Sequence, residues 1–232
     1  MARRPTSPRP LLIAAEGLDG GGKTVQLELL ARWLERRGRS VTVEPWDPSP
    51  SVERIATAPR LRPILTPRVA ALLAAADAAH RLELDVRRPL AKGSVVLADR
   101  YAWTAIAREI ARGLEPEWTA ALYRFAPRPD LILFFEQPVE EALAAALSRR
   151  ETSTRASAIS AAFEPFLHRM IAAFDALIEG STAARGRDSA ASAGFGPWTA
   201  PVLRVRRDPD ADSLARRIRA AVRPLFGAEL AA

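Results

Sequence analysis

The sequence contains no cysteine and few residues of the types that bind transition metals. Without cysteine among its 232 residues, the chain forms neither disulfide bonds nor thiolate metal sites. Its two histidines, His80 and His168, are too few to indicate a zinc centre. No apolar run reaches transmembrane length, and the basic, proline-rich start lacks the apolar core of a signal peptide. We therefore expect a cytoplasmic protein without a membrane partner, preceded by a disordered basic tail over residues 1–10.

Positive charge is in excess but is not concentrated in one region. The chain has 34 Lys and Arg against 27 Asp and Glu, a formal net charge of +7. Nearly all the basic residues are arginines, since Lys23 and Lys92 are the only lysines. These arginines alternate with acidic residues along the whole chain, whereas a nucleic-acid-binding surface gathers its basic residues on one face. The sequence thus predicts no nucleic acid partner.

Short apolar runs alternate with segments of helical periodicity. The runs are bounded by glycine or proline, which is typical of buried strands. Between them, apolar residues recur at helical spacing, as in Leu27, Leu30, Ala31 and Leu34. The predicted strands are 11–15, 40–45, 94–101, 128–138 and 201–207. The predicted helices are 24–38, 67–92, roughly 103–125, 139–150, 162–180 and 212–226, with a turn-rich stretch at 46–51.

This alternation predicts an α/β fold of three layers, in which helices cover both faces of a five-stranded parallel sheet. With 48% apolar residues, the chain supports one substantial core, and we expect a single domain over residues 11–228. A polar break between two helices, at about 148–160, is the expected place of a small lid. The small, polar stretch at about 181–201 is interpreted as a flexible insertion.

The first predicted turn carries the most specific motif of the chain. "GLDGGGKT" fits G-x-x-x-x-G-K-[ST], the loop whose backbone N–H groups and following helix N-terminus surround phosphates. In this motif the lysine reaches the β- and γ-phosphate oxygens, and the hydroxyl of the last residue binds Mg²⁺. We therefore predict ATP as the nucleotide and Mg²⁺ as its cofactor. The predicted ATP-binding residues are Gly17, Leu18, Asp19, Gly20, Gly21, Gly22, Lys23 and Thr24.

Four further side chains lie where parallel strands are expected to end, which is the ligand-binding edge of such a sheet. Asp99 can hold Mg²⁺ together with Thr24, and Arg100 can bind an acceptor phosphate as a bidentate fork. Asp19 either accepts a hydrogen bond from a sugar hydroxyl of the acceptor or is an ordinary turn residue before glycine. Glu44 either orients the acceptor or merely ends a strand.

Three arginines surround the predicted lid. A lid arginine neutralises the charge that develops on a phosphoryl group during transfer. The predicted catalytic residues are Lys23, Arg100, Asp19, Arg149, Arg150 and Arg155.

Together these motifs resemble those of the thymidylate kinases, and the resemblance runs from about residue 11 to 226. It rests on "EGLDGGGKTVQ", "VEP", "LAAAD", "RPLAKGSVVLADRY", "RPDLILFFEQP" and "FEPFLHRMIAAFDAL". The resemblance implies a P-loop nucleoside monophosphate kinase fold and the reaction of ATP·Mg²⁺ with dTMP. It further implies that Asp19 lies near the sugar 3′-hydroxyl, that the lid carries the catalytic arginine, and that the protein forms a homodimer.

The chain departs from the family at the positions that read the base. Family members usually present a phenylalanine and, four residues later, an arginine on the long helix, where this chain has Ala74 and Ala78. Trp103 and Arg108 follow "DRY" and join Asp19, Glu44 and Arg100 as candidate substrate-binding residues. The alternatives are a kinase of the same fold for another nucleotide or a deoxynucleoside, and a non-catalytic nucleotide-binding regulatory protein.

Overall fold

The computed structural model describes residues 9–46, 48–61, 63–148, 156–185 and 200–230. Its centre is a five-stranded sheet in which every neighbouring pair is parallel. The strands lie in the order β2-β3-β1-β4-β5, so the first strand of the chain occupies the middle of the sheet. Their bounds are β1 (Leu11–Glu16), β2 (Val41–Pro45), β3 (Val95–Asp99), β4 (Leu131–Glu136) and β5 (Val202–Arg206).

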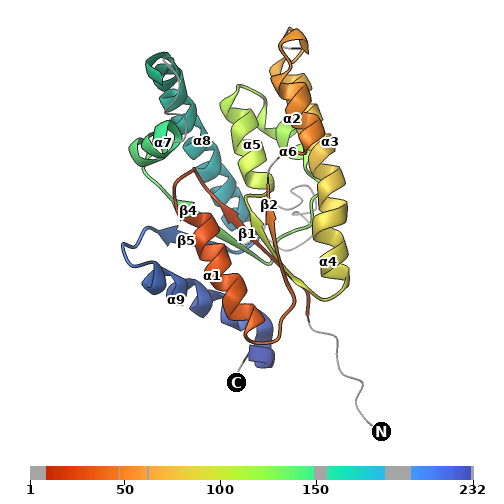
Figure 1. Cartoon of the computed structure of the whole chain (residues 1–232), viewed down its shortest axis with the longest axis vertical. Helices are drawn as coiled ribbons and strands as arrows, with labels where there is room; N and C mark the ends of the chain where they lie inside the picture. Colours follow the sequence, from red (N-terminus) through yellow and green to blue (C-terminus); the bar gives the residue numbers. More distant parts are fainter. Residues whose placement is uncertain (1–8, 47, 62, 149–155, 186–199, 231–232) are drawn as a thin grey trace.

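Helices connect the strands and enclose the sheet from both sides (Figure 1). The α-helices are α1 (Lys23–Glu35), α2 (Pro50–Thr57), α3 (Pro67–Arg81), α4 (Arg88–Ala91), α5 (Ala102–Ala111), α6 (Pro116–Leu122), α7 (Val139–Ser148), α8 (Ala156–Arg185) and α9 (Ala211–Val222). Helical segments of other types are η1 (Pro59–Leu61), η2 (Leu82–Arg87) and η5 (Arg223–Leu230). None of the helices in the described part of the chain is both long enough and apolar enough to span a membrane.

Each face of the sheet has its own core, because alternate residues of a strand point to opposite faces. Leu11 and Ile13 of β1 pack with α1 and α9, whereas Leu12 and Ala14 pack with α3, α5, α7 and α8. In β1, β3 and β4 nearly every residue is buried, as expected for parallel strands covered on both faces. The predicted three-layer α/β fold is thus confirmed.

The connections differ from the prediction in three places. The turn-rich stretch leads into helix α2, because Ser49 accepts a hydrogen bond from the Val52 N–H and Pro50 occupies the first turn. The predicted helix over 103–125 is two helices, α5 and α6, separated at Gly113, whose φ of 93° ends α5. Helix α8 runs from Ala156 to Arg185, so it begins within the predicted lid and continues into the predicted insertion.

Candidate active site

The phosphate-binding motif forms the loop between the central strand β1 and helix α1. Gly22 precedes α1 with a left-handed backbone (φ 78°), so the loop turns directly into the helix N-terminus. The side chain of Lys23 is 5% exposed, and its Nζ donates a hydrogen bond to the Leu18 carbonyl oxygen at 2.5 Å. The lysine therefore lies folded over its own loop, which places a positive charge where the N–H groups of the loop converge.

The start of this loop lies directly against strand β4. Gly17 has a φ of +124°, and a Cβ atom there would collide with the Phe135 carbonyl oxygen. Glycine is therefore required at this position for both its backbone conformation and its lack of a side chain.

Strand β3 brings Asp99 to the same edge of the sheet. Asp99 pairs with Ala15 in the register between β3 and β1, one strand away from the loop. The Thr24 hydroxyl donates a hydrogen bond to Asp99 Oδ2. Thr24 of α1 and Asp99 of β3, the two residues predicted to hold a metal ion, are thus in direct contact.

Arg100 reaches back from β3 to the phosphate loop. Its Nη2 forms an ion pair with Asp19, and its Nη1 donates to the Gly17 carbonyl oxygen at 3.1 Å. Its backbone N–H donates to the Ala15 carbonyl oxygen at 2.9 Å. Among the described residues other than glycine, Arg100 alone has a positive φ, 72°, which is a strained conformation for an L residue. Backbone strain of this kind persists where several contacts fix the position, as they do here.

Two cavities lie on either side of the Asp19–Arg100 ion pair. The first, the loop cavity, has a volume of about 470 Å³ and extends from the phosphate loop to the end of β2. It is lined by Asp19, Gly20, Gly22, Lys23, Thr24, Val25, Pro45, Trp46, Asp99 and Arg100. The second, the arginine cavity, has a volume of about 260 Å³ and lies between α5, α7 and α8. It is lined by Leu18, Asp19, Arg100, Arg108, Arg112, Ala142, Ala146, Phe163, Phe166, Leu167 and Met170.

The remaining predicted residues fall into three groups. Arg108 lines the arginine cavity beside Arg100, whereas Trp103 is only 1% exposed and lies in the core. Glu44 lines neither of the two cavities, although Pro45 and Trp46, which follow it, line the loop cavity. Burial and the nearby Asp85 raise its pKa, and Arg81 opposes the shift. The lid residues Arg149, Arg150 and Arg155 lie outside the described part of the chain.

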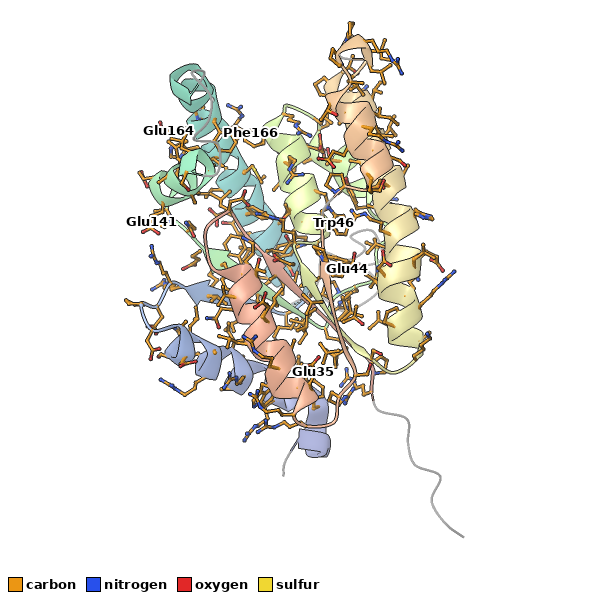
Figure 2. The ribbon with its side chains drawn as sticks, in the orientation of Figure 1. Glu35, Glu44, Trp46, Glu141, Glu164 and Phe166 are labelled. Atoms are coloured by element: carbon orange, nitrogen blue, oxygen red, sulfur yellow. The ribbon has the colours of Figure 1, made fainter. Side chains whose placement is uncertain are left out.

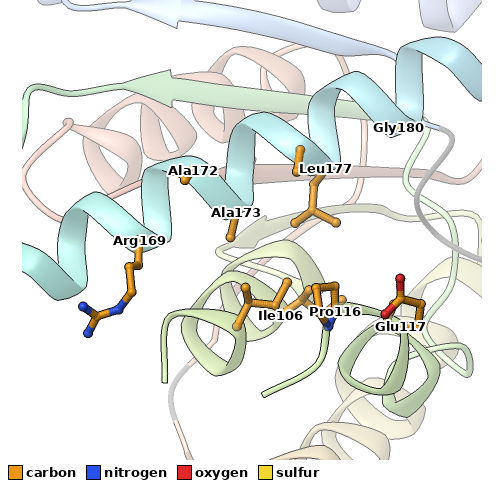
Figure 3. Close-up of a pocket in the computed structure, with 11 residues that line it drawn as sticks. Ile106, Pro116, Glu117, Arg169, Ala172, Ala173, Leu177 and Gly180 are labelled. Carbon is orange, nitrogen blue, oxygen red and sulfur yellow. The ribbon is translucent and has the colours of Figure 1, made fainter. Parts of the chain in front are cut away.

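A third cavity, of about 480 Å³, lies between helix α8 and the pair α5 and α6 (Figure 3). Its walls are mainly apolar, with Ile106, Leu177 and small residues of α8 facing one another across it. It shares no lining residue with the loop cavity or the arginine cavity. It is therefore separate from the two cavities that contain Asp19 and Arg100.

Sequence reasoning missed Glu16, which joins the phosphate loop to helix α5. Glu16 is fully buried at the end of β1 and accepts hydrogen bonds from the Trp103 N–H (2.9 Å), the Thr104 N–H (3.0 Å) and the Thr104 hydroxyl (2.5 Å). It thereby caps the N-terminus of α5 from a distant strand. The one sequence signal was an acid continuing the apolar run "LLIAAE".

Burial raises the pKa of Glu16 to about 7, against the opposing effects of the hydrogen bonds from Thr104 and Trp103 and of the positive Arg100. Between pH 4.5 and about 7 the folded protein therefore keeps a proton that the unfolded chain has released. This contribution to stability is fully present below pH 4.5 and is lost as the pH rises through 7. At 1.36 kcal/mol per pKa unit, the change amounts to about 3 kcal/mol.

We expect this dependence to appear in the difference between the wild type and Glu16→Gln, because all other titrating groups are common to both. The stability advantage of the wild type over the variant should shrink as the pH rises from 4.5 to 7. Urea unfolding at a series of pH values measures it. If the free energies of unfolding of the two proteins changed with pH in parallel, the raised pKa of Glu16 would be contradicted.

Comparison with known proteins agrees with this arrangement. The model of the thymidylate kinase family matches residues 15–182, which is more than half of the chain. A probable thymidylate kinase of Thermococcus kodakarensis is 36% identical over 152 residues, covering 62% of this chain and 74% of the relative. One of Pyrococcus horikoshii is 38% identical over 141 residues, covering 58% and 69%. The thymidylate kinase of Thermomicrobium roseum is 36% identical over 168 residues, covering 70% and 78%. The phosphate loop and the aspartate and arginine at the end of β3 all lie within the matched region, and the parallel sheet extends just beyond it. The chain therefore belongs to the thymidylate kinase family.

Proposed function

We propose that this protein transfers the γ-phosphoryl group of ATP to dTMP, giving ADP and dTDP. The observation that carries the proposal is the contact between Arg100 and Asp19, because it joins a phosphate-binding loop to a second phosphate-binding side chain. Several curated members of the family carry thymidylate kinase in their names. An acceptor phosphate is already an anionic nucleophile, so the reaction needs positioning and charge neutralisation rather than a general base.

The residues of the loop cavity supply those services in this proposal. The loop N–H groups and Lys23 bind the β- and γ-phosphates of ATP. Arg100 binds the acceptor phosphate as a two-pronged donor, for which the planar guanidinium is better suited than an ammonium group. Asp19, which shares the edge of both cavities, accepts a hydrogen bond from the sugar of the acceptor. Arg149, Arg150 and Arg155 remain candidates for the lid arginine.

The donor groups at Asp99 and Thr24 fit Mg²⁺. A hydroxyl and a carboxylate oxygen in contact are hard ligands, and Mg²⁺ keeps several waters and binds phosphate oxygens besides. No group of three or more His, Cys, Asp or Glu side chains suited to a metal occurs among the described residues, and this mode of binding requires none. Bound there with ATP, Mg²⁺ would neutralise charge on the β- and γ-phosphate oxygens.

The resemblance to the family also leads us to propose a homodimer in the cytoplasm, acting on small-molecule nucleotides and not on nucleic acid. Multi-angle light scattering of the purified protein measures the oligomeric state.

Release of ADP from ATP in the presence of a panel of acceptors tests the proposed reaction. We expect dTMP to give the highest kcat/KM among nucleoside monophosphates and deoxynucleosides, and EDTA to abolish turnover because the divalent cation is removed. Acceptor-dependent release with another compound but not with dTMP would refute the substrate. Binding of ATP without turnover on any acceptor would refute the kinase activity.

A further inference from the structure

The loop cavity contains a single aromatic side chain among its described lining residues, and that side chain is Trp46. Trp46 follows β2 directly and lies between that strand and α3 (Figure 2). It lines the cavity together with Asp99 and Arg100, the residues at the end of β3. An acceptor that occupies the loop cavity with its phosphate on Arg100 therefore meets this indole.

The position of the indole is fixed from several sides. The Trp46 backbone N–H donates to the Asp99 carbonyl oxygen at 3.0 Å, which ties it to β3. The Tyr101 ring meets it edge-on at 5.4 Å between centroids, and the Arg81 guanidinium carbon lies 5.1 Å from the Trp46 ring centroid. The indole is half-buried against the core that includes Tyr101 and Ala78. A rigid ring loses little conformational entropy when a ligand stacks on it.

Arg81 is itself held in place by contacts on α3 and β2. Its Nε donates to Asp77 Oδ2 at 3.2 Å, and its Nη1 donates to the Pro45 carbonyl oxygen at 3.4 Å. Asp77, which is mostly buried, also accepts a hydrogen bond from the Ser49 N–H at 3.1 Å. These contacts hold Pro45, which precedes the indole, and Ser49, which follows it in the sequence.

Two positions of α3, Ala74 and Ala78, offer neither a ring nor a side-chain hydrogen-bond donor. Ala74 and Ala78 have only methyl side chains, and Ala78 is buried in the core. Trp103, the other tryptophan near this end of β3, is also inside the core. Among the described residues that line the loop cavity, Trp46 is therefore the aromatic surface available to a base, whereas Phe163 and Phe166 line the arginine cavity.

We infer that Trp46 is a specificity-determining residue, against which the base of the nucleoside monophosphate acceptor stacks, and that Arg81 is a positioning residue for its ring. This inference rests on the proposed function and assigns the base-binding wall of that same site. Stacking of a base on an aromatic side chain typically changes affinity by about ten- to a hundredfold on alanine substitution.

The test measures the binding of dTMP in the absence of ATP by isothermal titration calorimetry. Trp46→Ala should weaken dTMP binding by about ten- to a hundredfold. Trp46→Phe should retain most of the affinity, because it keeps an aromatic face. Trp118 provides a matched control: it too is half-buried, with Arg68 stacked on its ring at 5.1 Å, but it lines neither the loop cavity nor the arginine cavity.

A second measurement does not depend on Trp46→Ala folding normally. Adding dTMP to the wild type should quench tryptophan fluorescence, and the quench should disappear in Trp46→Phe but persist in Trp118→Phe. Unchanged dTMP affinity in folded Trp46→Ala, or a persistent quench in Trp46→Phe, overturns the inference. If the wild type binds another monophosphate and not dTMP, the proposed substrate is wrong. The same variants are then measured with that monophosphate, and the result supports or overturns the role of Trp46. If the wild type binds no monophosphate, both proposals fall.

Discussion

Lys23→Ala is expected to lower kcat/KM for phosphoryl transfer by at least about a hundredfold, the effect typical of removing one charge-stabilising donor. Lys23 is nearly buried within the phosphate loop and donates to the Leu18 carbonyl oxygen at 2.5 Å. In the proposed reaction its ammonium group neutralises charge on the transferred phosphoryl group, and its burial leaves little water to screen that interaction. Steady-state ADP release with saturating dTMP and varied ATP measures the loss.

Lys92 makes the matched control for this substitution, because it is the other lysine of the chain and is exposed at the end of α4. Lys92→Ala should leave kcat/KM within about twofold, as expected for an exposed residue away from the site. Thermal unfolding of both variants shows whether a loss of activity comes from removal of the charge or from unfolding of the protein. A folded Lys23→Ala variant with near-wild-type turnover would remove Lys23 from the proposed machinery.

Arg100→Ala should also lower kcat/KM by at least about a hundredfold, and here the loss should be seen with the acceptor as the varied substrate. Arg100 forms the ion pair with Asp19 and donates to Gly17 in the phosphate loop, so its guanidinium lies where the two substrates are proposed to meet. Arg100→Lys should recover only part of the activity, because a single ammonium group does not reproduce the bidentate fork.

The positive φ of Arg100 allows its chemical role to be separated from its backbone role. Arg100→Gly relieves the strain of a φ of 72°, so this variant should be at least as stable as Arg100→Ala and equally inactive. Arg68→Ala serves as a control, since Arg68 is ion-paired with Glu115 at 3.0 Å on an exposed surface, and such pairs contribute about 0–1 kcal/mol. Recovery of turnover in Arg100→Gly would show that backbone geometry, and not the guanidinium, is what the site requires.

The order of elements was predictable because strands and helices leave local patterns in the sequence. All five predicted strands are present, since each is a short apolar run bounded by a turn residue. Helix α2 was missed because it buries none of its residues, which leaves no apolar stripe to recognise. The start of α8 was placed too late, at residue 162 and not at Ala156, because the polar segment before it resembles a break between helices. The strand order depends on contacts between distant residues, and no local pattern carries it.

The candidate site divides in the same way. The phosphate loop, Asp99 and Arg100 were predictable because each belongs to a short motif, and the structure places them around one cavity. Trp103 was a candidate because of its place after Arg100, but the first turn of α5 directs its side chain into the core. Glu16 and Trp46 contact residues that are distant in the sequence. Trp103, which donates to Glu16, lies 87 residues from it, and Arg81, which stacks on Trp46, lies 35 residues from it. Such pairings follow from the fold and not from the local sequence.

The central position of β1 has a consequence for how the protein is made. The strand that ends in the phosphate loop is synthesised before its two neighbours, β3 and β4, which begin at Val95 and Leu131. The close contact of Gly17 with Phe135 belongs to the second of these pairings. Contacts so distant in sequence form slowly, since a long loop must close before they contribute. A nascent chain therefore completes the surroundings of this loop only after Phe135 has been synthesised and β4 has paired with β1.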